Sequence, residues 1–319
     1  MSDNASEKNP SLLENAPLAY ENLRFLNSPD GRIIRILSEY SEPLARFRRE
    51  RIQDTVVFFG SARFRAREEA SHELELLENT GSRQPAPHEE QPARQPELEE
   101  GTASELKLSR AEAAVEMAQY YEDARQLARL LTEWTKTLKS SRHRFVVTSG
   151  GGPGIMEAAN RGAYEAGGKS IGLNIKLPFE QFPNRYITPS LNFEFHYFFM
   201  RKYWFAYLAK ALVVFPGGFG TLDEMFELLT LAQTHKLAKQ ITVVIYGSAY
   251  WESVVNLDVL VAKGAISPRD RDLFQFANTP EEAFAILKEG LTNNHLANEA
   301  LYHPEDEARL NPEIAKTRR

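Results

Sequence analysis

The sequence contains no cysteine, so disulfide bonds, thiolate metal ligands and a cysteine nucleophile are excluded. Its seven histidines are scattered and form no His-Glu-x-x-His pattern, so no metal site is predicted. A Gly-x-Ser-x-Gly turn is also absent, which leaves serine-hydrolase chemistry without support.

Long apolar runs and an excess of positive charge are absent as well. No stretch approaches about 20 uninterrupted apolar residues, so no membrane-spanning helix is predicted. The first residues carry neither the basic start nor the apolar run of a secretory signal. With 38 Lys and Arg against 44 Asp and Glu, the formal net charge is −6, and broad electrostatic attraction to nucleic acid is not expected. We therefore expect a cytoplasmic protein that binds neither membranes nor nucleic acid.

The chain of 319 residues, 42% of them apolar, is long enough for one large domain or two small ones. We expect a polar tail and two helices over 1–52, a main domain over 53–290 and a polar tail over 291–319. Residues 68–105 are rich in Glu and Pro and lack Val, Ile, Met and aromatic residues. Such a segment buries little surface, so the main domain is predicted to carry a disordered or partly helical acidic insert. A solvated insert is favoured, and an acidic arm that binds a partner is the alternative.

Continuous apolar runs indicate strands that are covered on both faces. They lie at 55–59, 145–148, 170–175, 211–215 and 241–246. Helical spacing is found at 109–138, 154–166, 196–210, from Thr221 to about 235, and near 249–263 and 280–289. This alternation predicts an α/β fold with a doubly wound parallel sheet and helices on both faces.

Two glycine-rich turns join a predicted strand to a predicted helix. They are Ser149-Gly150-Gly151-Gly152-Pro153-Gly154 and Pro216-Gly217-Gly218-Phe219-Gly220-Thr221. Ligands of open parallel sheets bind at the carboxyl ends of the strands. There, backbone N–H groups and the positive end of the following helix favour an anion. The two turns together favour a phosphate-bearing ligand, and the alternative is that the glycines only form tight turns.

Known phosphate motifs do not match these turns. A dinucleotide-binding Gly-x-Gly-x-x-Gly pattern fails because Ile155 or Glu157 stands where its last glycine is needed. Near Gly167, a segment imitates the end of a P-loop, but Ala163 replaces the required glycine. NAD and ATP hydrolysis are therefore disfavoured, and no cofactor is expected.

Charged residues accompany the second turn. The Thr221 hydroxyl either caps the helix or reaches a phosphate, and Asp223 complements the helix dipole. A carboxylate at Glu224 weakens phosphate binding unless it serves a ribose hydroxyl or a water. Arg201 and Lys202 lie in a strongly aromatic helix, either as a basic pair at its edge or with an anionic partner for the arginine.

Three motifs resemble one known family. They are S-G-G-G-P-G-I-M-E-A-A-N at 149–160, M-R-K at 200–202 and P-G-G-F-G-T-L-D-E at 216–224. Together they resemble the LOG family of cytokinin riboside 5′-monophosphate phosphoribohydrolases, long mislabelled as lysine decarboxylases. The resemblance covers roughly 53–63 and 110–290, and the N-terminal helices are similar to those of the longer bacterial members. No lysine in a recognisable pyridoxal-phosphate setting supports decarboxylation.

The resemblance implies a Rossmann-like fold, commonly in a homodimer or larger homo-oligomer. It also implies hydrolysis of the N-glycosidic bond of a nucleoside 5′-monophosphate to free base and ribose 5-phosphate. Arg201 and Glu224 match the catalytic pair of the family. We expect further substrate contacts from Ser61, Gly151, Gly152, Gly154, Glu180, Lys202, Gly217, Gly218, Phe219, Gly220, Thr221, Leu222, Asp223 and Thr230.

The implied chemistry agrees with the residues. N-glycosidic cleavage passes through an oxocarbenium-like transition state, which a carboxylate such as Glu224 stabilises. Arg201 then either holds the phosphate or draws charge from the departing base. A non-catalytic nucleotide-binding or carrier protein on the same fold is the alternative function. The preferred base stays open among cytokinin activation, purine salvage and general nucleotide turnover.

Overall fold

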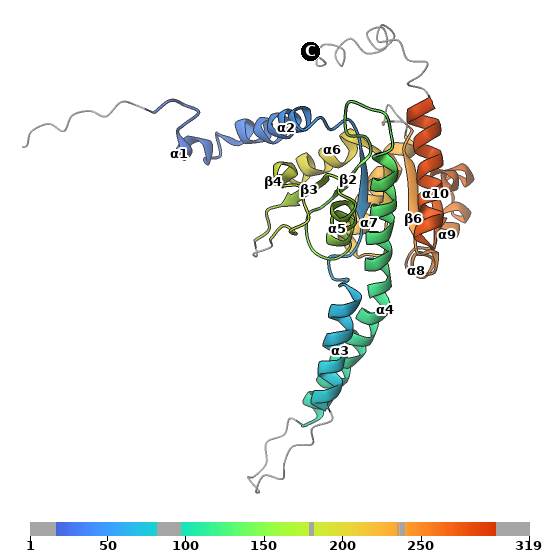
Figure 1. Cartoon of the computed structure of the whole chain (residues 1–319). Helices are drawn as coiled ribbons and strands as arrows, with labels where there is room; N and C mark the ends of the chain where they lie inside the picture. Colours follow the sequence, from blue (N-terminus) through green and yellow to red (C-terminus); the bar gives the residue numbers. More distant parts are fainter. Residues whose placement is uncertain (1–16, 82–96, 179–181, 235, 237–239, 298–319) are drawn as a thin grey trace, which may run out of the picture. The chain divides into compact units, whose positions relative to one another are not determined.

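The computed structural model describes residues 17–81, 97–178, 182–234, 236 and 240–297 (Figure 1). The chain divides into two compact units, Met1–Leu44 and Ala45–Arg319. The two N-terminal helices that the sequence predicts are α1 (Leu23–Leu26) and α2 (Arg32–Arg49), with the break at 28–31 between them. Across the described ranges, every helix is too short or too polar to cross a bilayer.

The second unit contains a parallel sheet of seven strands, and the predicted doubly wound α/β fold is confirmed (Figure 1). The strand order is β4-β3-β2-β1-β5-β6-β7. The strands are β1 (Thr55–Phe59), β2 (Val146–Ser149), β3 (Ser170–Ile175), β4 (Asn192–Phe195), β5 (Ala209–Val214), β6 (Thr242–Tyr246) and β7 (Gln275–Ala277). The five strands predicted from apolar runs are all present.

The two edge strands, β4 and β7, were not predicted from the sequence. They have four and three residues, so neither offers a continuous apolar run. In β4 the exposed Glu194 lies between the buried Phe193 and Phe195, because an edge strand is covered less completely than a central one. The neighbouring 3₁₀ helices, η1 (Pro189–Leu191) and η2 (Pro268–Leu273), precede these strands.

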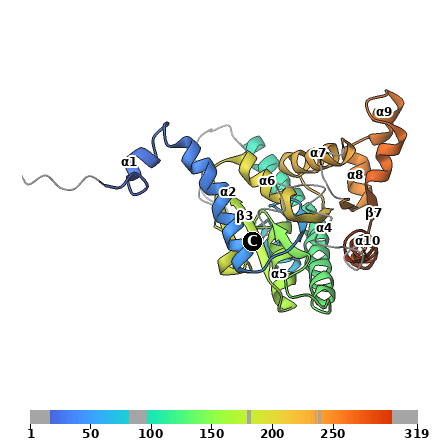
Figure 2. The same cartoon turned by 90° about the horizontal axis from the view of Figure 1, so that it is seen from above.

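Helices cover both faces of the sheet (Figure 2). On one side lie α4 (Glu97–Thr135), α5 (Ile155–Glu165) and α10 (Pro280–Leu291), which is followed by a π-helical turn at Thr292–Leu296. On the other side lie α6 (Phe198–Leu208) and α7 (Phe219–Gln233). Successive residues of β1 show the division: Phe58 joins the apolar cluster of α4 and α5, whereas the ring of Phe59 packs edge-on against Phe205 of α6. The single helix expected at 249–263 is two, α8 (Ser248–Val254) and α9 (Leu257–Ala262).

The acidic insert is more ordered than the composition of 68–105 suggested. Its described parts form α3 (Arg67–Gly81) and the beginning of α4, against which α3 packs. Ala70 and Ala111 are both buried, and Glu68 and Glu69 complement the dipole at the start of α3. Good helix formers and one packed neighbour therefore order this segment where a lone chain of the same composition would not fold. Residues 82–96 lie outside the described part of the insert.

The order of the strands creates a switch point beside β1. The chain leaves β1 for β2, β3 and β4 on one side, and β5 then pairs with the other edge of β1. The last pair in this ladder is Phe59 with Val214, so the loops that follow β1 and β5 begin next to each other. In open α/β sheets, ligands bind in the crevice at such a point.

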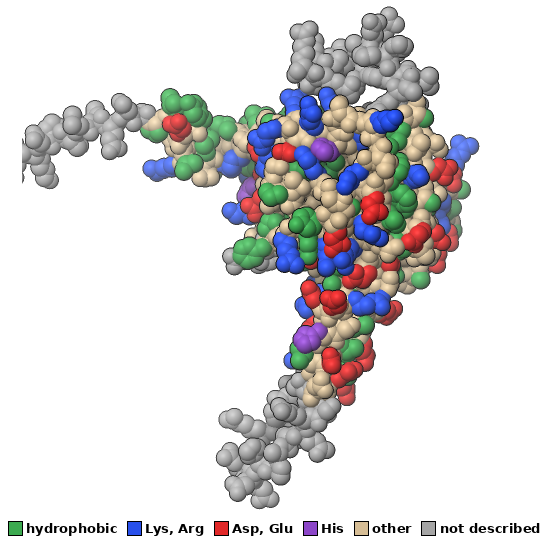
Figure 3. Space-filling model, viewed as in Figure 1, with side chains coloured by type: hydrophobic (Ala, Val, Ile, Leu, Met, Phe, Trp, Pro, Cys, Tyr) green, Lys and Arg blue, Asp and Glu red, His purple; other side chains and the backbone are tan. Residues whose placement is uncertain are grey.

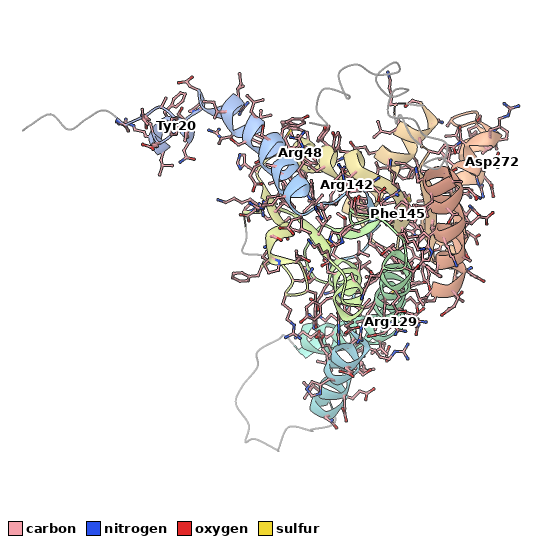
Figure 4. The ribbon with its side chains drawn as sticks, turned by 45° about the horizontal axis from the view of Figure 1, so that its top comes forward. Tyr20, Arg48, Arg129, Arg142, Phe145 and Asp272 are labelled. Carbon is pink, nitrogen blue, oxygen red and sulfur yellow. The ribbon has the colours of Figure 1, made fainter. Side chains whose placement is uncertain are left out.

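A buried ion pair joins the starts of β1 and β2, at the edge of the sheet away from the switch-point loops. Arg144 Nε donates to Asp54 Oδ2 at 2.8 Å, and both residues are at most 5% exposed. The Asp54 carboxylate also accepts from the backbone N–H of Phe145, a non-glycine residue with a φ of 53° that Figure 4 labels. Burial raises the pKa of Asp54, while Arg144 and these hydrogen bonds oppose that shift.

We expect Asp54→Ala to lower the free energy of unfolding by about 3–5 kcal/mol, because it removes the carboxylate that balances a buried guanidinium. Chemical denaturation of the purified variant measures this loss. The matched control is Asp258→Ala. Asp258 also pairs with an arginine, Arg271, but its side chain is 88% exposed, so its removal should cost little stability. Equal effects of the two substitutions would contradict the assigned role of Asp54.

Candidate active site

Three loops meet at the carboxyl edge of the sheet. The backbone N–H of Ser61 donates to Pro216 O at 3.0 Å, and the N–H of Ile155 donates to Ser61 O at 3.0 Å. Gly154 has a φ of +72°, and a Cβ there would lie 2.3 Å from Ser61 O. This position therefore requires glycine, and the structure brings Ser61, Gly154 and the second glycine turn together.

A buried polar network holds the first glycine turn. Asn184 Nδ2 donates to the carbonyls of Gly151 and Gly152, both at 3.1 Å, and to Asn160 Oδ1 at 2.9 Å. The Ser149 hydroxyl also donates to Asn160 Oδ1, at 2.7 Å. Sequence reasoning missed Asn184, because a single asparagine in a loop forms no pattern. Asn160 ended one of the quoted motifs, and its burial inside α5 gives it this structural role.

The second glycine turn leaves the start of α7 open. Gly218 occupies the N-cap position and no side chain caps the helix, so the capping alternative for Thr221 is wrong. The Thr221 side chain instead lies against Gly217, where an added Cβ would meet its Oγ1 at 2.1 Å. The Tyr250 hydroxyl donates to Gly217 O at 3.0 Å and fixes the turn from the other side. At this open end, Gly218 and Gly220 are exposed, as is Phe219.

Glu224 lies one and a half turns into α7 and is only 8% exposed. No hydrogen bond reaches its carboxylate from the residues that the structure describes. Burial raises the pKa of Glu224 from about 4.5 to about 7, against the opposing charges of Arg201 and Lys202. A buried carboxyl group that titrates near neutrality and has no internal partner is typical of a functional group.

Arg201, on α6, shares this environment. Its Nε donates to Leu173 O at the end of β3, at 2.8 Å, and its guanidinium carbon lies 5.0 Å from the ring centre of Phe205. A Cβ at Gly150 would come within 2.6 Å of Arg201 Nη2, so the first glycine turn makes room for the guanidinium. Burial lowers the pKa of Arg201, and the charge of Glu224 opposes that shift. The structure thus brings the two expected catalytic residues into electrostatic contact, and their roles stay predictions.

Lys202 and Asp223 bind each other. Lys202 Nζ lies 2.8 Å from Asp223 Oδ2 and 2.8 Å from Glu227 Oε2. Burial opposes the charge of Lys202, but the hydrogen bonds to these two carboxylates raise its pKa overall. The ion pairs join α6 to α7 next to Arg201 and Glu224, so they position the helices that carry the pair.

Other expected contact residues are engaged within α7 or fall outside the described ranges. The exposed Thr230 donates its hydroxyl to Phe226 O at 2.7 Å, and the half-buried Leu222 donates its N–H to Gly218 O. Glu180 lies outside the described residues. Within the described ranges, no three His, Asp or Glu side chains gather in a way that would hold a metal ion.

Comparisons with known proteins match the segment that carries Arg201 and Glu224. The family model described as "Possible lysine decarboxylase" matches residues 156–287. A probable cytokinin riboside 5′-monophosphate phosphoribohydrolase of Oryza sativa subsp. japonica is 28% identical over 154 residues, covering 45% of this chain and 68% of the relative. The cytokinin riboside 5′-monophosphate phosphoribohydrolase LOG7 of Arabidopsis thaliana is 29% identical over 175 residues, covering 53% of this chain and 74% of the relative.

Among solved structures, a Moco carrier protein from Chlamydomonas reinhardtii is 22% identical, with a TM-score of 0.37. The match covers 55% of this chain and 89% of that chain. The family and sequence matches confirm the resemblance of this chain to the LOG family, over the segment that contains Arg201, Lys202 and the second glycine turn.

Proposed function

We propose that this chain hydrolyses the N-glycosidic bond of nucleoside 5′-monophosphates to free base and ribose 5-phosphate. The observation that carries the proposal is Glu224, a buried carboxyl group that accepts no hydrogen bond from any described residue and lies beside Arg201, near the open start of α7. The names of the matched relatives support phosphoribohydrolase activity at the level of the family.

The phosphate is proposed to bind at the start of α7. The first N–H groups of a helix have no partner inside it, and the helix dipole favours an anion there. No side chain caps α7, and Gly218 and Gly220 have open space where a Cβ would stand. Backbone N–H groups from Gly217 to Thr221 would then hold the phosphate and position the sugar.

The carboxylate of Glu224 would then face the anomeric carbon. Glu224 follows Phe219 by five helical positions, which is about 7.5 Å along the axis, a span that one ribose 5-phosphate bridges. Water oxygen forms the new bond to C1′, and the C1′–N bond breaks with its electron pair going to the base. Glu224 orients this water, takes its proton and stabilises the positive charge that develops on the sugar. The departing base gains a proton, so one water balances the reaction.

Arg201 would act on the same carbon from α6. Its charge lowers the pKa of Glu224 and so keeps more of the carboxylate ionised than burial alone would allow. Because Nε is held by Leu173 O, the guanidinium has a fixed orientation before substrate binds. It is thereby placed to draw negative charge from the departing base.

A panel of nucleoside 5′-monophosphates, each beside its unphosphorylated nucleoside, tests the proposal. We expect base release from at least one monophosphate, with AMP and a cytokinin riboside 5′-monophosphate in the panel. The matching nucleosides should be cleaved at least about a hundredfold more slowly, because phosphate binding energy positions the sugar. Chromatography of the free base measures both rates. Tight nucleotide binding without any base release would support a carrier protein instead.

We expect Glu224→Gln to fold normally and to reduce kcat about a hundredfold or more, because an amide neither takes a proton nor carries negative charge. Circular dichroism and single-turnover assays measure the two properties. Glu133→Gln is the matched control, since Glu133 is exposed and pairs with Arg129 on α4. Turnover of Glu224→Gln at the rate of this control would refute the catalytic role.

The pH profile of kcat/KM should report the titration of Glu224. Its folded-state pKa is raised to about 7, and the ionised form is the active one, so kcat/KM should rise with pH through about 7 and then level off. In Glu224→Gln this rise should vanish, leaving only the titration of the substrate phosphate near pH 6. The same shift means that Glu224 stabilises the fold fully below about pH 4.5 and that this contribution is lost as pH rises through about 7. A wild-type kcat/KM that falls as pH rises through about 7 would contradict the assignment.

A further inference from the structure

An open cavity lies beside the loops that form the candidate active site. It has a volume of about 770 Å³ and is lined by the loop after β1, the loop after β2, and helices α3, α4 and α5. Its floor includes Ala62, Pro153 and Gly154. Cavities of this size hold drug-sized ligands in other proteins.

Three cations around this cavity have no partner among the residues that the structure describes. Arg63 comes from the loop after β1, and Lys107 and Arg110 come from α4. Their side chains form no hydrogen bond or ion pair with other described residues. Arg65 differs, because its Nη1 lies 2.6 Å from Glu73 Oε2. The four cations of the lining outnumber its three carboxylates, Glu69, Glu73 and Glu157, although further acidic side chains gather along α3 (Figure 3).

The remaining lining suits an uncharged ring and its polar groups. Phe64, Leu77, Ala111 and Tyr121 supply apolar surface. The Tyr121 hydroxyl donates to Glu157 Oε1 at 3.0 Å, which leaves the second carboxylate oxygen of Glu157 as an acceptor. Cations, apolar surface and a carboxylate in one cavity match the phosphate, base and hydroxyl groups of a nucleotide.

This cavity is separate from the candidate active site. Its lining comes from the loops after β1 and β2 and from α3, α4 and α5, and it includes neither Arg201 of α6 nor Glu224 of α7. The two places share a wall, since Ala62 follows Ser61 and Gly154 lies against Ser61 O. A molecule in the cavity would therefore contact the back of the loops that hold Arg201 and the second glycine turn.

We propose that this cavity binds a second molecule, a nucleoside phosphate. Its phosphate is held by Arg63, Lys107 and Arg110, and its base packs on Phe64 and Leu77. The insert between β1 and the main part of α4 thus acts as one wall of an effector site, which requires its helices to be ordered.

Binding to the full-length Glu224→Gln protein tests the proposal, because AMP binding is then read without turnover. Isothermal titration with AMP should show two sites per chain. Adding Arg63→Ala and Arg110→Ala together should remove one site or weaken it about tenfold or more, since each cation makes a charge-assisted hydrogen bond. Arg129→Ala is the matched control, an exposed arginine on the same helix that does not line the cavity. Identical titrations of the double variant and this control overturn the proposal.

A second pair of variants tests the nucleotide class. Leu77→Ser should weaken AMP binding at this site but leave the binding of inorganic phosphate unchanged, because only the base contacts Leu77. Leu76→Ser is the neighbouring control, a residue that is 54% exposed and does not line the cavity. Equal effects of the two substitutions on AMP binding contradict a base on this wall. Loss of the Arg63 and Arg110 site is measured by binding alone, so it is independent of whether AMP is hydrolysed.

Discussion

The proposed function depends on one unfavourable arrangement: the carboxyl group of Glu224 is only 8% exposed and accepts no hydrogen bond from the residues that the structure describes. Desolvation of a carboxylate costs free energy unless charges or donors compensate for it. Here the compensation comes from the charges of Arg201 and Lys202, and it is incomplete, since the pKa stays near 7. A bound sugar that becomes positively charged would supply the missing partner, which is why the arrangement favours catalysis over simple phosphate binding.

The rest of the fold keeps this group in place. The switch between β1 and β5 puts two loops at one edge of the sheet, and the ion pairs of Lys202 with Asp223 and Glu227 fix α6 against α7. Asn184 holds the first glycine turn through its carbonyls. The proposed effector cavity borders the first glycine turn at Pro153 and Gly154, and Gly150 of the same turn lies against the guanidinium of Arg201.

Central features of the fold were predictable because parallel strands leave a strong signal. The apolar run at 170–175 matches β3 in full, and the glycine turns marked the loops where β2 and β5 end. The edge strands were not predictable, because β4 and β7 are short and half covered. For the insert, the sequence left open whether it is disordered or partly helical, because the packing of α3 on α4 that orders it does not show in its composition.

For the site, residue chemistry alone singled out Glu224, because a carboxylate beside a phosphate site repels the phosphate unless it serves another part of the ligand. The partners of its neighbours required coordinates: Lys202 of α6 and Asp223 of α7 form an ion pair, and their expected contacts with ligand stay a prediction. Asn184 had no pattern, and the open start of α7 depends on the direction of the Thr221 side chain, which no spacing reveals. Positions set by long-range packing are thus the part that sequence reasoning leaves out.

The most direct test of the central claim is the ionisation of Glu224 itself. Infrared difference titration of the wild-type chain against Glu224→Gln follows the C=O stretch of the one carboxyl group that the variant lacks. We expect this band to disappear with an apparent pKa near 7, as a desolvated carboxyl group beside Arg201 requires. An apparent pKa near the ordinary value of 4.5 would mean that Glu224 is solvated, and it would contradict the account.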